Sequence, residues 1–285
     1  MQGQVADSAF VSAGEGVRSP GIIYGTAWKQ MRTEELVRTA IHEGFRAIDT
    51  ACQPRHYHEP GVGAAVAACV RDGVSRAELY LQTKFTPLPG HDPQRVPYDP
   101  AAPPAQQVAQ SFATSLRNLQ TDYVDCLILH SALPDHDQMT EVWEAMEQIF
   151  HAGGARQLGI SNCSDAASLQ SLYRTAKVKP AVVQNRFYAQ TGYDHKIRAF
   201  CRHEAISYQS FWTLTANPRL LAHGVVTTLA AKYERSAAQI LFRYLTQNDV
   251  VPLTGTTSVA HMREDLAIFE FQLTGAELEA VGSLL

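Results

Sequence analysis

The chain has 285 residues, with 24 Lys and Arg against 28 Asp and Glu, so its formal net charge is −4. With 45% hydrophobic and 18% charged residues it is typical of a globular protein, and it has no basic run that indicates nucleic-acid or membrane-surface binding. No apolar stretch approaches the roughly 20 residues that span a bilayer, and the N-terminus lacks the pattern of a secretory signal. Five scattered cysteines without a C-x-x-C motif indicate reduced thiols, so we expect a cytoplasmic protein.

Short apolar runs alternate with helical patterns along the chain. We predict eight strands, at residues 21–24, 46–49, 79–84, 124–130, 157–160, 181–184, 205–208 and 250–253. Helical patterns cover residues 33–43, 62–71, 105–119, 140–152, 165–175, 194–202, one longer stretch around 225–246, and 259–269. The strands are continuous apolar runs, as expected when both faces of a parallel sheet are buried. Eight strand–helix units in about 250 residues favour a closed (β/α)8 TIM barrel of the α/β class.

We expect one barrel domain over residues 21–285, preceded by a flexible N-terminal segment over residues 1–20. An open doubly wound sheet is the alternative, but a G-x-G-x-x-G turn is missing after the first strand, where the sequence is YGTAW. The proline-rich segment 87–104 is too long for a simple connector, so we predict a loop over one mouth of the barrel.

Ionisable residues end three consecutive predicted strands: Asp49, Lys84 and His130. In a (β/α)8 barrel the active site lies at the carboxyl ends of the strands, and neighbouring strands are about 4.8 Å apart. Each residue alone could be a turn cap, a solvated amine or a packing residue. All three together, on one face of the barrel, favour an active site in which they contact one another.

Tyr57 follows Asp49 in the next loop and is a candidate proton donor. An ammonium close to a phenol lowers the pKa of the phenol from its usual value of about 10. We therefore expect Lys84, paired with Asp49, to make Tyr57 a usable acid near neutral pH. The alternative is an ordinary, partly exposed loop tyrosine.

These residues lie in motifs that resemble those of the aldo-keto reductase superfamily. GFRAIDTA at residues 44–51 resembles the family's G-[FY]-R-x-[IL]-D-T-A, and Glu59, Val62 and Gly63 match its Y-x-N-E-x-x-V-G element. DYVDCLILH at residues 122–130 is similar to D-Y-[IV]-D-x-x-L-I-H. GISN at 159–162 and VQN at 183–185 resemble the family's strand ends that contact the cofactor.

The resemblance implies a single-domain barrel that reduces an aldehyde or ketone with NADP(H), without a metal. It implies Tyr57 as the general acid, Lys84 and Asp49 as the residues that tune it, and His130 as the residue that orients the carbonyl. Further cofactor contacts are implied for Gly25, Thr26, Asp49, Ser161, Asn162, Gln184, Tyr208, Ser210, Phe211, Thr254, Gly255, Thr256, His261, Glu264 and Asp265. Among these, Ser161, Asn162 and Gln184 would hold the carboxamide. Tyr208 would stack on the nicotinamide ring.

The position of the acid departs from the family pattern. The family places its tyrosine five residues after the aspartate, whereas Tyr57 lies eight residues after Asp49. Counting back from Glu59 by the usual interval leads to His56. We interpret residues 52–56 as carrying a small insertion that leaves Tyr57 as the acid, with His56 as the alternative.

The cofactor segment also departs from the pattern. Leu253 stands where NADP-selective members carry a lysine, and His261 stands where they carry an arginine. Loss of two cations weakens the binding of a doubly charged phosphate, although Arg263 could compensate from a nearby position. The resemblance favours NADP(H), and these changes leave NAD(H) as an alternative cofactor.

The sequence ends soon after residues 274–279, where many members of the family continue into a loop that covers the substrate. We therefore expect an open mouth, with Trp28 and Trp212 either as its apolar walls or as core residues. A small carbonyl compound is the expected partner, with no nucleic acid or membrane, and the oligomeric state is left open. A nucleotide-binding regulatory or scaffold protein and a Schiff-base lyase that uses Lys84 are the alternative functions.

Overall fold

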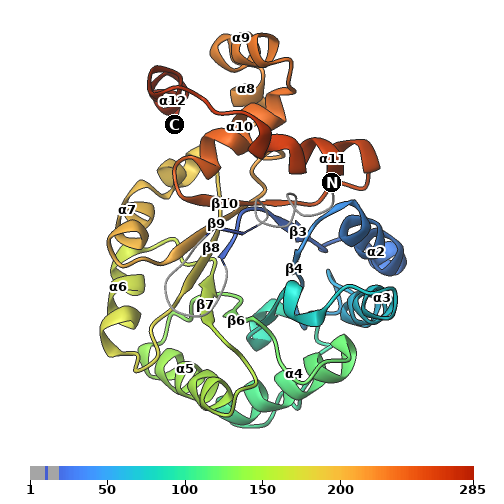
Figure 1. Cartoon of the computed structure of the whole chain (residues 1–285). Helices are drawn as coiled ribbons and strands as arrows, with labels where there is room; N and C mark the ends of the chain where they lie inside the picture. Colours follow the sequence, from blue (N-terminus) through green and yellow to red (C-terminus); the bar gives the residue numbers. More distant parts are fainter. Residues whose placement is uncertain (1–9, 12–18) are drawn as a thin grey trace.

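A closed β-barrel forms the centre of the protein. The computed structural model describes residues 10–11 and 19–285, and over these residues eight parallel strands close into a barrel in which β10 pairs with β3. The strands are β3 (Ile23–Gly25), β4 (Ala47–Asp49), β5 (Tyr80–Phe85), β6 (Cys126–Leu129), β7 (Leu158–Ser161), β8 (Val182–Arg186), β9 (Ser207–Phe211) and β10 (Val250–Thr254). The predicted (β/α)8 barrel is confirmed, and each predicted strand overlaps an observed one (Figure 1).

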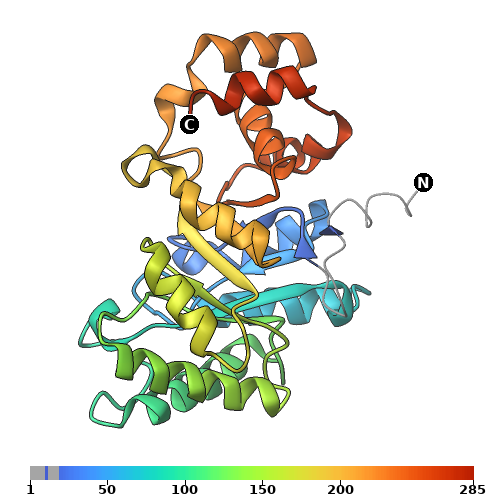
Figure 2. The same cartoon turned by 90° about the vertical axis from the view of Figure 1, so that its left-hand side faces the viewer.

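Helices surround the strands (Figure 1). They are α2 (Thr33–Glu43), α3 (Glu59–Arg71), α4 (Pro104–Leu119), α5 (His136–His151), α6 (Ala166–Thr175), α7 (His195–His203), α8 (Pro218–Leu221), α9 (Gly224–Tyr233), α10 (Ala237–Thr246), α11 (Val259–Leu266) and α12 (Gly275–Gly282). Short 3-10 helices lie at η1 (Gln30–Arg32), η2 (Arg76–Glu78), η3 (Leu88–Gly90), η4 (Ala189–Asp194) and η5 (Ala267–Glu270). The side view shows α9 and α12 next to each other, farther from the barrel than α10 (Figure 2).

The single longer helix predicted around residues 225–246 is wrong, because the structure divides it into α9 and α10. Helix α9 ends at Glu234, whose φ of 53° is left-handed and cannot continue a helix. Helix α10 then begins with a capping box, in which Ser236 and Gln239 each bond the other's backbone N–H.

Side chains alternate between the bore of the barrel and the layer under the helices, because successive residues of a strand point to opposite faces. One buried apolar cluster fills the bore with Ile23, Ala47, Tyr80, Cys126, Ile128, Val182 and Val251. A second, larger cluster packs the outer faces of the strands against the helices. On each strand, the residue that comes two positions after a member of this cluster therefore also points into the bore, closer to its carboxyl end.

The segment that was predicted to be flexible, residues 1–20, is described in part. β1 (Phe10–Val11) pairs antiparallel with β2 (Ser19–Pro20), and residues 1–9 and 12–18 lie outside the described residues. The segment after β5 folds back over the end of that strand, because Tyr98 donates to the Thr86 carbonyl at 2.9 Å and packs on Phe85. Within the described residues, no helix combines the length and apolarity that crossing a membrane requires.

Candidate active site

Asp49 and Lys84 meet at the carboxyl end of the bore. Asp49 ends β4 and pairs in register with Gln82 of β5. Lys84 lies two residues after Gln82, on the same face of β5, and its side chain extends to Asp49. Lys84 Nζ donates to Asp49 Oδ1 at 2.5 Å and to the Thr50 carbonyl at 2.8 Å, and both side chains are buried. Burial lowers the pKa of Lys84, while the neighbouring Asp49 charge acts in the opposite direction.

Tyr57 packs against this pair. The Lys84 ammonium lies 5.1 Å from the centroid of the Tyr57 ring, and the His130 ring meets Tyr57 edge-on with centroids 5.9 Å apart. Burial raises the pKa of the Tyr57 hydroxyl, and the Asp49 charge raises it further. The expectation that the pKa of Tyr57 is lowered is therefore wrong, because burial and the Asp49 charge both raise it.

His56 turns away from this group of residues. Its ring stacks on Trp28 with centroids 4.1 Å apart, and its carbonyl accepts the Trp28 N–H at 2.7 Å. The turn is held by Gln53, whose backbone carbonyl accepts the N–H of both His56 and Tyr57 at 3.1 Å. The Gln53 side chain also donates to the Gly90 carbonyl at 2.8 Å. This turn places Tyr57, rather than His56, against Lys84 and His130.

His130 follows β6 and is held on two sides. Its Nδ1 lies 2.7 Å from the Thr86 hydroxyl, and its backbone carbonyl accepts the Asn162 side-chain amide at 2.8 Å. Burial, together with the Lys84 charge, holds the pKa of His130 well below its usual range. The imidazole is therefore neutral at neutral pH, with Nε2 as the ring nitrogen that Thr86 does not contact.

The three residues expected to hold a carboxamide lie side by side. Ser161 and Gln184 are paired in register, and Ser161 Oγ donates to the Gln184 carbonyl at 2.7 Å. Gln184 Nε2 is already bonded, to Asp49 Oδ1 at 3.0 Å and to Gln209 Oε1 at 3.0 Å. Asn162 is exposed and has a left-handed φ of 51°. Asn162 is therefore the most accessible of the three.

Tyr208 does not face the bore. Its ring is buried in the outer core, and its hydroxyl donates to Asp194 Oδ2 at 3.0 Å. Because residues alternate along β9, the neighbouring Gln209 faces the bore and exchanges hydrogen bonds with Gln82 at 2.9 and 3.1 Å. Tyr208 is therefore separated from the other predicted cofactor residues. The side-chain amide of Gln209 lies in the bore at the position where the ring was expected. Neither Gln82 nor Gln209 was expected at this site from the sequence.

The expected cofactor residues of β3 and β9 lie at the ends of their strands. Gly25 ends β3, and Thr26 is fully buried with its hydroxyl donating to the Asp49 carbonyl at 2.8 Å. Ser210 is also buried and accepts the Thr213 hydroxyl at 2.9 Å, whereas Phe211 is half-buried. Only Phe211 of this group offers side-chain surface to a ligand.

The expected cofactor residues of β10 and α11 form a second group. Gly255 and His261 are exposed, and Thr256 and Glu264 are half-buried. Thr254 Oγ1 donates to the buried Asp265 at 2.7 Å. Burial raises the pKa of Asp265 to about 6, because its carboxylate has lost water and gained only one neutral hydrogen bond.

Lys29 is a buried cation beside this group, and it was not expected from the sequence. Its Nζ donates to the Gly255 carbonyl at 2.8 Å and lies 4.9 Å from the Tyr24 ring centroid. Burial lowers the pKa of Lys29 to about 8, and the Arg32 charge contributes. No carboxylate pairs with Lys29 within the part of the chain that the structure describes. The sequence signal that could have indicated this residue is its position, directly after the YGTAW turn at the end of the first strand.

Arg263 is engaged elsewhere. Its guanidinium forms a bidentate pair with Glu43 of α2, at 2.7 and 2.9 Å. This pair lowers the pKa of the Glu43 carboxyl. Arg263 therefore cannot replace the missing cations unless it leaves Glu43.

Trp28 and Trp212 lie at the carboxyl-end mouth of the barrel. They follow β3 and β9, and their side chains are 62% and 49% exposed. Both have left-handed φ values, 64° and 57°, which are uncommon for aromatic residues. The exposure favours walls of the mouth over core packing.

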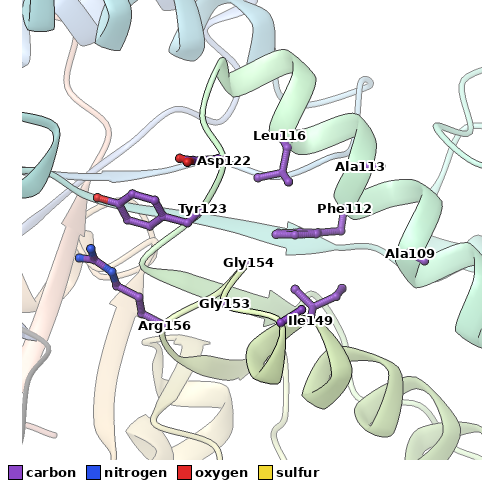
Figure 3. A pocket seen from close by; sticks show the side chains of 11 residues that line it. Ala109, Phe112, Ala113, Leu116, Asp122, Tyr123, Ile149, Gly153, Gly154 and Arg156 are labelled. Atoms are coloured by element: carbon purple, nitrogen blue, oxygen red, sulfur yellow. The ribbon is translucent and has the colours of Figure 1, made fainter.

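A hollow of about 670 Å³ lies away from the site, between α4 and α5 (Figure 3). Phe112 and Leu116 of α4 face Ile149 of α5 across it, and Tyr123 and Arg156 line its edge. Tyr123 precedes β6 and Arg156 precedes β7, so the hollow is at the amino ends of the strands, where (β/α)8 barrels do not carry their chemistry.

The comparisons with known proteins agree with this geometry. The model of the "Aldo/keto reductase family" matches residues 22–285. The chain belongs to the aldo/keto reductase family. Among curated relatives, a glyoxal reductase of Bacillus subtilis is 29% identical over 251 residues, which cover 88% of this chain and 82% of the relative. An aldo-keto reductase of Mycobacterium tuberculosis is 30% identical over 253 residues, with the same two coverages.

Solved structures of aldo-keto reductases have the same fold. An aldo/keto reductase from Brucella melitensis superposes with a TM-score of 0.81 at 27% identity, over 97% of this chain and 99% of that one. A Bombyx mori aldo-keto reductase in complex with NADP has a TM-score of 0.81 at 25% identity, over 96% and 92% of the two chains. Membership of this family supports an oxidoreductase that acts on carbonyl compounds and uses a nicotinamide cofactor.

Proposed function

We propose that this aldo-keto reductase reduces an aldehyde or ketone to an alcohol, with Tyr57 as the general acid. The observation that carries the proposal is the position of the Tyr57 ring, which lies against both the Lys84 ammonium and the His130 ring. A proton donor, a cation and a neutral imidazole at one point are the groups that a carbonyl oxygen needs when it gains charge.

Each residue has a separate part in this proposal. A bound reduced nicotinamide supplies the hydride for the carbonyl carbon. Because burial raises its pKa, Tyr57 holds its proton at neutral pH and donates it to the carbonyl oxygen. Lys84, fixed by Asp49, stabilises the phenolate that remains, and His130 Nε2 orients the carbonyl oxygen because Nδ1 is held by Thr86.

The residues at the ends of β3 and β10 fit a dinucleotide. Lys29 is a buried cation with a lowered pKa and no carboxylate partner among the described residues, which is the condition expected of a group that meets an anionic ligand. We propose that it contacts the phosphates of the cofactor beside Gly255. Ser161, Asn162 and Gln184 would hold the carboxamide, and Gln209 would face the ring in place of Tyr208.

We propose that NADP(H) and NAD(H) are both used, with little discrimination. A 2′-phosphate is recognised mainly by charge-assisted hydrogen bonds, and Leu253 and His261 stand where family members place a lysine and an arginine. Arg263 is held by Glu43 and adds nothing while that pair persists. We therefore expect NADPH to bind only slightly more tightly than NADH.

The test begins with separate titrations of the purified protein with NADPH and NADH, followed through quenching of Trp fluorescence. Consumption of the bound cofactor is then measured with small aldehydes, which the similarity to a glyoxal reductase supports as first substrates. Binding together with turnover supports the reductase. Binding of nucleotide without turnover of any aldehyde or ketone favours a regulatory or scaffold role, and absence of binding contradicts the proposal.

A further inference from the structure

Arg186 ends β8 on the side of the strand that faces the bore. Val182 belongs to the apolar cluster of the bore, and Gln184 contacts Asp49 inside it. Because every second residue of a strand shares a face, Arg186 is the next residue of β8 on the bore side. It pairs in register with Phe211, the last residue of β9. Arg186 therefore lies at the carboxyl end of the barrel, where the candidate active site is.

Aromatic rings surround the Arg186 guanidinium. Its central carbon lies 4.0 Å from the Trp212 ring centroid, 5.4 Å from that of Tyr188 and 6.0 Å from that of Phe211. These rings limit the access of water to the cation. They leave its planar edge, which carries the N–H donors, as the part that can bind a ligand.

Among the residues that the structure describes, the side-chain donors of Arg186 have no hydrogen-bond partner. Its Nε is buried without a hydrogen bond, and no carboxylate lies within ion-pair distance among residues 10–11 and 19–285. The Nε atoms of Arg76 and Arg235 are also buried without a partner, but their guanidinium groups pair with Asp125 and Glu270. Arg186 thus combines a buried Nε that has no hydrogen bond with half-buried Nη donors at the mouth of the site, which is an arrangement that can bind an anion.

We propose that Arg186 binds a carboxylate of the substrate, so that the preferred substrates are aldehydes or ketones that carry an acidic group. This inference rests on the proposed reductase function. The guanidinium matches a carboxylate with two parallel hydrogen bonds, which gives orientation as well as affinity. In the proposed function the phosphates of the cofactor meet Lys29 at the ends of β3 and β10, and β9 lies between β10 and β8.

The test compares two aldehydes of the same shape, 4-carboxybenzaldehyde and its neutral methyl ester. The wild type is expected to prefer the carboxylate in kcat/KM by about 10- to 100-fold, the range of a charge-assisted hydrogen bond. Arg186→Met is expected to bring this ratio close to one, and Arg186→Lys to restore part of it. Arg71→Met, a change at an exposed arginine of α3, serves as the matched control and keeps the wild-type ratio.

Two further measurements separate the possible outcomes. Binding of the alcohol product, 4-(hydroxymethyl)benzoate, is followed by ligand-observed NMR in wild type and Arg186→Met, because it needs no turnover. If neither aldehyde is reduced but this binding still depends on Arg186, the reductase proposal fails and the carboxylate site stands. A wild-type ratio near one, or a ratio that survives Arg186→Met, overturns the inference. Weaker NADPH and NADH binding in Arg186→Met with an unchanged ratio assigns Arg186 to the cofactor and also overturns it.

Discussion

The rings of Trp28 and His56 stack at 4.1 Å, and this contact separates His56 from the residues around Lys84. The stack joins the loop after β3 to the loop after β4 on the rim of the barrel. Tyr57, the next residue, consequently points to the opposite side of the turn. Two adjacent residues with proton-donating side chains thus occupy different environments.

Tyr57→Phe is expected to lower kcat/KM for aldehyde reduction by about 10²- to 10⁴-fold, because it removes only the proton that the carbonyl oxygen receives. Nucleotide binding should persist. The matched variant His56→Phe keeps a ring on Trp28 and should retain most of the turnover. Steady-state kinetics and cofactor titration of both variants show which of the two residues donates the proton. A loss in His56→Phe that equals the loss in Tyr57→Phe assigns the acid to His56.

Lys29→Met is expected to weaken dinucleotide binding by about 10- to 100-fold, because a desolvated cation that meets the phosphates is lost. The same change should stabilise the unliganded protein by about 1–3 kcal/mol at pH 7, since a lowered lysine pKa means that the folded state disfavours the charge. This cost of Lys29 is fully present below pH 8 and disappears as the pH rises through the unfolded value of 10.5.

Urea unfolding at pH 7 and pH 10, together with NADH and NADPH titrations, measures both effects of Lys29→Met. Lys196→Met, at an exposed lysine of α7, is the control and should change neither quantity. Unchanged cofactor affinity in Lys29→Met would show that the phosphates bind elsewhere.

Asp265→Asn is expected to raise the free energy of unfolding by about 2 kcal/mol at pH 7. The folded pKa of Asp265 is raised from 3.8 to about 6, so its charge destabilises the fold above pH 6, and this cost is lost as the pH falls through 3.8. The asparagine keeps an oxygen that accepts the Thr254 hydroxyl. Chemical unfolding at pH 7.5 and pH 4 is the measurement, and an equal gain at both pH values contradicts the assignment.

Glu43→Gln is expected to release Arg263 and to raise the affinity for NADPH relative to NADH by about 3- to 10-fold. The pair is exposed on the Arg263 side, so stability should change by less than about 1 kcal/mol. Parallel titrations with both cofactors measure the ratio. The double variant Glu43→Gln with Arg263→Gln should return the ratio to the wild-type value, and a ratio that stays high would exclude Arg263 as the cause.

The sequence alone was sufficient to predict the barrel and the positions of three candidate residues at its carboxyl end. Asp49, Lys84 and His130 come directly at the ends of apolar runs, and a strand end is a local property that periodicity indicates. Because parallel strands place all their carboxyl ends on one face, knowing the strands was enough to predict that these three residues lie at the same end of the barrel. The Asp49–Lys84 contact follows from that arrangement.

The tertiary structure was needed to see which way the Tyr208 side chain points and which residues form hydrogen bonds inside the bore. A shift of one residue in a strand reverses every side chain, and the boundaries of β9 differ from the predicted strand at residues 205–208. Gln209 therefore lies in the bore and Tyr208 outside it. Neither residue type nor spacing indicates which of two adjacent residues faces inward when both faces of a strand are buried.

The remaining decisions came from contacts between distant parts of the chain. Gln53 bonds Gly90 and holds the turn that places Tyr57, rather than His56, against Lys84. Lys29 is buried beside Gly255, whose carbonyl accepts its hydrogen bond. Arg263 is occupied by Glu43, which lies 220 residues away in the sequence. The architecture and the residues that end its strands follow from local patterns, so they can be predicted from the sequence. Which side chains are buried, paired or left without a partner becomes visible only in the folded protein, because burial and charge pairing are set by the folding of distant segments against one another.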